Sequence, residues 1–158
     1  MNEKMLSRLT RLAILLIGVC GVLSCLLWVP ISTENATLRA LPWRSYSFLI
    51  QYVFHWCVSL PCFLLLGLAW RVTANMNCNG LFMEENARYV GRAAVILIFD
   101  DLAFLIGNVI FAALGWNRWL TLHIPVAVTG LVLAIFMYVL SQYLARAAAL
   151  QEESDLTV

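Results

Sequence analysis

Two adjacent carboxylates interrupt a long apolar stretch and are the residues best placed for chemistry. Asp100 and Asp101 lie within the run from Ala93 to Leu114. An ionised carboxylate at the centre of a bilayer costs ~2.5–3.5 kcal/mol, so it normally faces a partner or a water-filled cavity. Two neighbouring carboxylates in a low dielectric also resist double ionisation, so we expect one of them to hold a proton at neutral pH. The pair is a candidate site for binding a proton or a ligand within a membrane.

Polar side chains in the neighbouring apolar stretches are candidate partners for this pair. His55 is the best internal partner, because a helical rise of ~1.5 Å per residue places it at a depth near that of Asp100. Gln51 shares a helical face with His55, and Asn108 shares one with Asp101. These five residues form the predicted intramembrane polar centre. The alternative is a hydrogen-bonded pin that only fixes the register of the helices.

Other chemistries have less support in the sequence. His55 and His123 could in principle hold haem or a metal, but we expect them at different depths and therefore predict no cofactor and no metal. The five cysteines include no C-x-x-C, and we expect them to be small interior packing residues. G-x-S-x-G, H-E-x-x-H and Gly-rich phosphate-loop motifs do not occur in the sequence. We predict that the protein is not an enzyme.

Composition indicates which elements position these residues. The chain has 158 residues, of which 63% are hydrophobic and 12% charged, and its mean hydropathy is +0.86. Soluble domains are about half apolar and about a quarter charged, so a water-soluble enzyme is nearly excluded. The net charge of +1 provides no basic field for a nucleic-acid backbone, so we expect no direct nucleic-acid binding.

Four apolar stretches are each near or above the ~20 residues that a helix needs to cross a bilayer. They cover residues 12–31, 47–70, 93–114 and 122–144. The sequence therefore predicts an all-α polytopic membrane protein, a single domain over residues 1–158 with four transmembrane helices in an antiparallel bundle. Stripes of small and polar residues on each stretch should converge on the interior of this bundle.

The basic residues predict the orientation of these helices in the membrane. Cytoplasmic segments are enriched in Lys and Arg, and aromatic residues favour the interfaces. Three basic clusters fall at one predicted end of the helices, and a smaller set falls at the other. The first set is Lys4, Arg8, Arg11, Arg71, Arg88, Arg92 and Arg146, and the second is Arg39, Arg44 and Arg118. We predict that both termini are cytoplasmic.

The first stretch has a competing interpretation as a secretory signal, because basic residues precede its apolar run. The sequence from Gly21 to Cys25 fits the loose pattern of a lipoprotein cleavage box, in which the cysteine becomes the acylated N-terminus. The apolar run continues through Val29, where a mature lipoprotein usually turns polar. We therefore expect an uncleaved helix.

Two segments resemble a known family. The run from Leu81 to Arg88, LFMEENAR, resembles the signature F-[ST]-x-E-N-x-[KR], and the run from Leu150 to Val158, LQEESDLTV, resembles the ending L-x-x-E-x-D-L-T-V. Both are features of the YoaS-like family of small bacterial four-span inner-membrane proteins of unknown function. Met83 stands where the family usually has Ser or Thr, so Glu84, Glu85 or Asn79 must cap the helix in its place, or the helix frays.

The resemblance implies a multi-pass protein of the bacterial inner membrane and a cytoplasmic partner, a helix-turn-helix transcriptional regulator. A small acidic surface could dock such a basic partner, although the same residues could simply cap and solvate helix ends. The candidate contact residues are Glu84, Glu85, Asn86, Glu152, Glu153 and Asp155.

Two functions follow as hypotheses. The first is a non-enzymatic sensor or regulatory partner of a cytoplasmic regulator. The alternative is a small proton- or cation-linked transporter or channel subunit that uses Asp100 and Asp101. Four helices are too few for a typical single-chain transporter, so the alternative requires a homo-oligomer.

Overall fold

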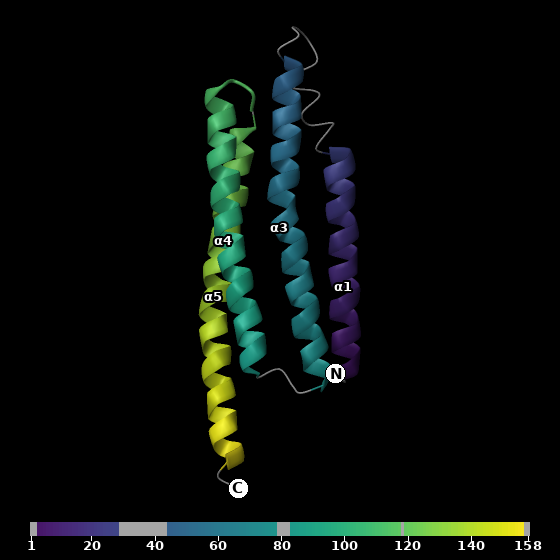
Figure 1. The fold of residues 1–158 in the computed structure, drawn as a ribbon, viewed down its shortest axis with the longest axis vertical. Coiled ribbons are helices and arrows are strands. Elements are labelled where there is room, and N and C mark those ends of the chain that lie inside the picture. Colours follow the sequence, from purple (N-terminus) through teal and green to yellow (C-terminus); the bar gives the residue numbers. More distant parts are fainter. Residues whose placement is uncertain (1–2, 29–43, 79–82, 118, 157–158) are drawn as a thin grey trace.

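The regular structure of the described chain is entirely helical. The computed structural model describes residues 3–28, 44–78, 83–117 and 119–156. Helix α1 (Glu3–Leu23) continues into a π-helical segment, η1 (Ser24–Trp28). Helices α3 (Arg44–Cys78), α4 (Glu84–Ala113) and α5 (Leu120–Leu156) follow, and successive helices run in opposite directions (Figure 1). The predicted all-α fold of antiparallel membrane-spanning helices is confirmed.

All four of these helical segments are long and apolar enough to cross a membrane. The candidate spans are Ser7–Leu27, Leu49–Asn75, Glu84–Ala113 and Leu120–Ser154. Helix α3 has 35 residues, which at ~1.5 Å per residue extend about 52 Å, well beyond a ~30 Å hydrocarbon core. Both α3 and α4 therefore continue into the predicted connection over residues 71–92. Asn79, one of the residues expected to cap the third helix, lies outside the described residues.

Contacts between the helices follow their order in the chain. Within the described ranges, α1 with η1 contacts α3, α3 contacts α4, and α4 contacts α5, whereas α1 and α5 are not in contact. The prediction that all four polar stripes converge on one interior is therefore wrong. The helices pack instead as a series of pairs, because each stripe is used against its neighbour in the chain.

The α4–α5 pair is the most closely packed, and small residues permit this approach. Ala94 on α4 and Ala127 and Ala134 on α5 are completely buried. A Cβ added at Gly91 would lie 3.2 Å from the Ser141 hydroxyl oxygen of α5. The predicted small-residue stripe on α5 thus contacts α4.

Larger side chains contribute to the other two contacts. The ring of Phe54 on α3 lies directly on Gly107 of α4 and also meets Phe111 edge to face, with ring centroids 5.0 Å apart. On α1, Gly18 and Gly21 approach side chains of α3. These contacts set the register of each helix against the next.

The ends of α4 are stabilised in different ways. Gly115, with φ +72°, follows the helix, and the amides of Gly115 and Trp116 donate to the carbonyls of Ala112 and Phe111. This is the Schellman arrangement, which satisfies the last carbonyls of the helix. At the other end Met83 makes no side-chain cap, and the first turn carries Glu84 and Glu85, whose charges favour the positive end of the helix dipole.

Candidate functional site: a polar layer across the helices

Asp100 faces helix α3 from the middle of α4. Its side chain is buried, with 9% of the residue exposed. The Cys62 thiol of α3 donates to Asp100 Oδ2, with 3.6 Å between sulfur and oxygen. A thiol is a weak donor, so this bond only partly compensates the carboxylate for lost hydration.

Asp101 faces the opposite neighbour, helix α5. Its carboxylate lies directly against Gly130, where a side chain of any size would collide with it. Oδ2 of Asp101 is buried and has no hydrogen-bond partner in the described part of the chain. Because successive helical residues diverge by about 100°, the two adjacent carboxylates bridge α4 to two different helices.

The η1 extension of helix α1 also contributes a residue near Asp100 and Asp101. The buried Cys25 thiol donates to the Ser59 hydroxyl of α3 over 3.2 Å, and that hydroxyl donates to the His55 carbonyl over 2.7 Å. We call the set Cys25, Ser59, Cys62, Asp100 and Asp101, together with Gly130, the mid-helix polar layer. It contains residues from α3, α4 and α5 and from the extension of α1.

His55 and Gln51 lie apart from this layer. His55 Nδ1 donates to the Gln51 carbonyl at 2.7 Å, and its ring meets Phe54 edge to face. Gln51 is buried, and its Nε2 has no partner among the described residues. No hydrogen bond or ion pair links His55 to either aspartate within the described ranges.

The register of α3 against α4 explains why the predicted aspartate–histidine pair does not form. Phe54 sits on Gly107, and this contact brings Cys62 rather than His55 beside Asp100. Cys62 lies seven residues after His55, which is about 10 Å along a helix. The depths of His55 and Asp100 in the membrane were estimated from opposite ends of their helices, and such an estimate cannot detect that two residues are displaced by two helical turns.

Asn108 belongs to a second polar group, at the turn between α4 and α5. It is completely buried, donates to the Phe104 carbonyl, and accepts a 2.7 Å hydrogen bond from Asn117 Nδ2. The same Asn117 nitrogen donates to His123 Nδ1 at 3.0 Å. This group closes the α4–α5 hairpin and does not reach the aspartates.

The predicted cytoplasmic contact residues do not form one set in the structure. Asn86 is completely buried and accepts from Asn75 Nδ2 of α3, which also donates to Glu85 at 3.3 Å. Glu84 forms a 2.8 Å ion pair with Arg88. Asn86 therefore holds α3 to α4 and is not an accessible contact.

The remaining acids are remote from Glu84 and Glu85. Glu152 and Glu153 are exposed near the end of α5, whereas the side chain of Asp155 lies outside the described residues. Ala145 of α5 lines the same groove as Glu84 of α4, and Glu153 lies eight residues, about 12 Å, beyond it. The predicted single acidic surface is thus two separate groups.

The chemistry available at the mid-helix polar layer is that of a carboxyl pair with weak donors. The layer contains two acids, two thiols and a hydroxyl, and no basic side chain. No group of three or more His, Cys, Asp or Glu able to hold a metal occurs among the described residues. Such a layer can take up or release a proton, and it can offer oxygen atoms to a small cation.

Several residues of these groups escaped the sequence analysis as polar partners. Spacing places Ser59 and Cys62 in the predicted polar stripe with Gln51 and His55, but only His55 and Gln51 were assigned to the polar centre. Asn75 and Asn117 lie at helix ends, where polar residues are common, and gave no signal. The expectation that the cysteines are interior is wrong for Cys20, Cys57 and Cys62, which are exposed on the single chain, and correct for Cys25.

The fold and the polar layer define a class: a polytopic α-helical membrane protein with ionisable residues midway along its spans. Within this class the chain belongs to the family described as "Protein of unknown function (DUF2975)", which matches residues 11–158. Comparison with curated proteins and with solved structures gave no match.

Proposed function

We propose that the protein is a non-enzymatic sensor or regulatory partner of a cytoplasmic helix-turn-helix regulator in the inner membrane of a bacterium. Within its family we place it in the YoaS-like group, on the two sequence segments that resemble that group. Its N- and C-termini both face the cytoplasm. Its input is the mid-helix polar layer, and its output is the cytoplasmic end of α5.

The orientation is supported by charge and geometry together. The start of α1, the ends of α3 and α4 that adjoin residues 79–82, and the end of α5 lie at the same end of the molecule (Figure 1). Arg8, Arg71, Arg88 and Arg146 lie toward this end of their helices. Basic residues are retained on the cytoplasmic side of short connections, so this end is the cytoplasmic one.

The observation that carries the proposal is the position of Asp101. Its buried and unpartnered Oδ2 lies against Gly130, so a change in protonation or ligation of this carboxyl would act on the α4–α5 contact. Helix α5 continues from that contact to Leu156, beyond the level at which α4 begins (Figure 1). A rigid helix of this kind can transmit a displacement from the middle of the membrane to a cytoplasmic partner.

A complementation experiment tests this proposal. The gene is deleted in the source bacterium and restored as wild type, as the double variant Asp100→Asn and Asp101→Asn, or without residues 150–158. We expect the deletion to change the transcripts of one regulator's targets. Wild type should restore them, while both variants should fail at normal membrane abundance. Full restoration by both variants, or an unchanged transcript profile after deletion, would refute the proposal.

A second candidate is a proton- or cation-linked transporter or channel subunit. The observation in its favour is the same unpartnered Asp101 oxygen, which is available to a proton or a small cation. Reconstituted protein should then be a defined oligomer with flux that Asp101→Asn abolishes. A monomer without flux would argue against transport.

A further inference from the structure

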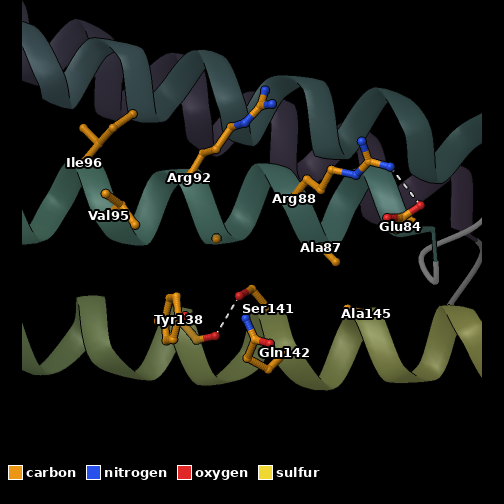
Figure 2. A pocket seen from close by; sticks show the side chains of 11 residues that line it. Glu84, Ala87, Arg88, Arg92, Val95, Ile96, Tyr138, Ser141, Gln142 and Ala145 are labelled. Atoms are coloured by element: carbon orange, nitrogen blue, oxygen red, sulfur yellow. Dashed lines mark hydrogen bonds and ion pairs between the residues drawn. The ribbon is translucent and has the colours of Figure 1, made fainter.

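A groove of about 540 Å³ runs between α4 and α5 near the end at which α4 begins. Figure 2 shows the residues that line it. Arg88 and Arg92 come from α4, and in this view their side chains extend away from α5, whereas Tyr138 and Gln142 come from α5. Val95 and Ile96 continue the lining toward the middle of α4. The groove is distinct from the mid-helix polar layer.

The lining of the groove is apolar at one end and charged at the other. Its deeper part is lined by Val95, Ile96 and the ring of Tyr138, and the part nearer the helix end carries Arg88 and Arg92. Arg92 directly precedes the apolar stretch 93–114. An arginine at such a boundary lies at the level of lipid headgroups, while the apolar part lies at the level of acyl chains.

The charges of the groove leave one cation uncompensated. Arg88 is paired with Glu84 at 2.8 Å. No acidic side chain pairs with Arg92 within the described ranges. Gly91 lets Ser141 of α5 approach α4 closely, and the side chain of the next residue, Arg92, extends from the other side of α4, beside the groove. A guanidinium group with free donors beside an apolar channel is suited to a phosphate that carries an acyl chain.

We propose that the α4–α5 groove binds an anionic phospholipid, with its phosphate on Arg92 and one acyl chain along Val95 and Ile96. A soluble phosphate would use only the charged part and would leave the apolar part empty. A zwitterionic lipid would bring its own cation to a site that already has a positive charge in excess. The proposal goes beyond the proposed function and does not depend on a regulatory partner.

Native mass spectrometry of the purified full chain tests this lipid site. The detergent-solubilised protein is titrated with phosphatidylglycerol, with phosphatidylcholine and with inorganic phosphate. We expect one phosphatidylglycerol to be retained in preference to phosphatidylcholine. Arg92→Gln should weaken this retention about tenfold, since a charge-assisted hydrogen bond is lost, and Arg92→Lys should restore part of it.

Two further variants separate a built site from general surface charge. Arg71→Gln removes the same charge from an exposed position on α3, away from the groove, and should leave retention unchanged. Gln142→Trp places a large side chain in the groove without removing a charge and should reduce retention. Thermal unfolding of each variant in the same detergent confirms that the protein remains folded.

Four outcomes would overturn the lipid site. Equal losses in Arg92→Gln and Arg71→Gln would show that lipid is held by surface charge alone. Equal retention of phosphatidylcholine would remove the need for an anionic headgroup. Displacement of the lipid by millimolar inorganic phosphate, or occupation of the groove by a protein partner in place of lipid, would assign the groove to another occupant.

Discussion

The carboxylate of Asp101 on α4 occupies the space that a Cβ of Gly130 on α5 would need, so an acid and a glycine share one contact between two membrane-spanning helices. The neighbouring Ala127 and Ala134 of α5 are completely buried against α4. Close packing of small residues is the main source of helix association in lipid, and here it also encloses a carboxyl group. The same contact therefore contributes to the stability of the α4–α5 pair and surrounds the carboxyl group of Asp101 that can take up a proton.

Gly130→Ala should destabilise the α4–α5 pair. Its new Cβ would collide with the Asp101 carboxylate, and overpacking of this kind costs about 1–3 kcal/mol. We expect a lower free energy of unfolding in mixed micelles and lower membrane abundance. Gly67→Ala is the matched control, because nothing lies within 4 Å of a Cβ at that position. Equal effects of both substitutions would show that the Asp101 contact is not tight.

Asp101→Asn should stabilise the protein even where it impairs function. The substitution keeps the shape of the side chain and removes a carboxylate whose Oδ2 has no partner in the described chain. The intramembrane cost of such a charge is ~2.5–3.5 kcal/mol, and we expect a gain of about 1 kcal/mol or more in unfolding titrations. Asp100→Asn should gain less, since the Cys62 thiol already compensates Asp100 in part. A loss of stability in Asp101→Asn would indicate a partner for its carboxylate.

Asn86→Ala should lower the free energy of unfolding by about 1 kcal/mol or more, because it removes a completely buried side chain together with its hydrogen bond from Asn75, which keeps only its 3.3 Å bond to Glu85. Glu152→Ala, at an exposed position on α5, should change it by less than about 0.5 kcal/mol. Thermal unfolding in detergent measures both. If both variants are equally stable, Asn86 does not hold α3 to α4 and is again a candidate for contact with a partner.

Phe54→Ala should loosen the contact between α3 and α4. The ring fills the space above Gly107 and packs on Phe111, so its removal leaves a cavity and should cost about 2 kcal/mol or more. Spin labels on α3 and α4 should report a broader distance distribution. Phe99→Ala is the control, since this ring is 70% exposed on the surface of α4. A similar broadening in both variants would contradict the assigned contact.

Hydropathy was sufficient to predict the four spans, because a continuous apolar stretch of the right length has few alternatives to a membrane helix. It was not sufficient for helix lengths. Helix α3 continues through Arg71 to Cys78 although Thr73 and Asn75 are weak helix formers, because Thr73 donates to the Ala69 carbonyl and Asn75 donates to Asn86 of α4. The predicted connection consequently shortened from 22 residues to the few between Cys78 and Glu84.

Which polar residues meet could be predicted only in part. Asp100 and Asp101 are indeed at mid-helix, as their position in the apolar stretch required. Their partners depend on a register that contacts such as Phe54 with Gly107 determine, and no spacing within one helix contains that information. Asn86 was misplaced for a related reason, because a polar residue in a helix's first turn is normally solvated and here it is covered by α3.

The sequential contacts of the helices have a consequence for how the chain can assemble. In the described ranges each helix packs only on the helices before and after it in the chain. A helix entering the membrane during synthesis therefore finds its first partner already in place and need not wait for later segments. Local contacts of this kind favour rapid folding. The last two helices, joined by the short turn at Gly115, can form their hairpin as a unit of their own.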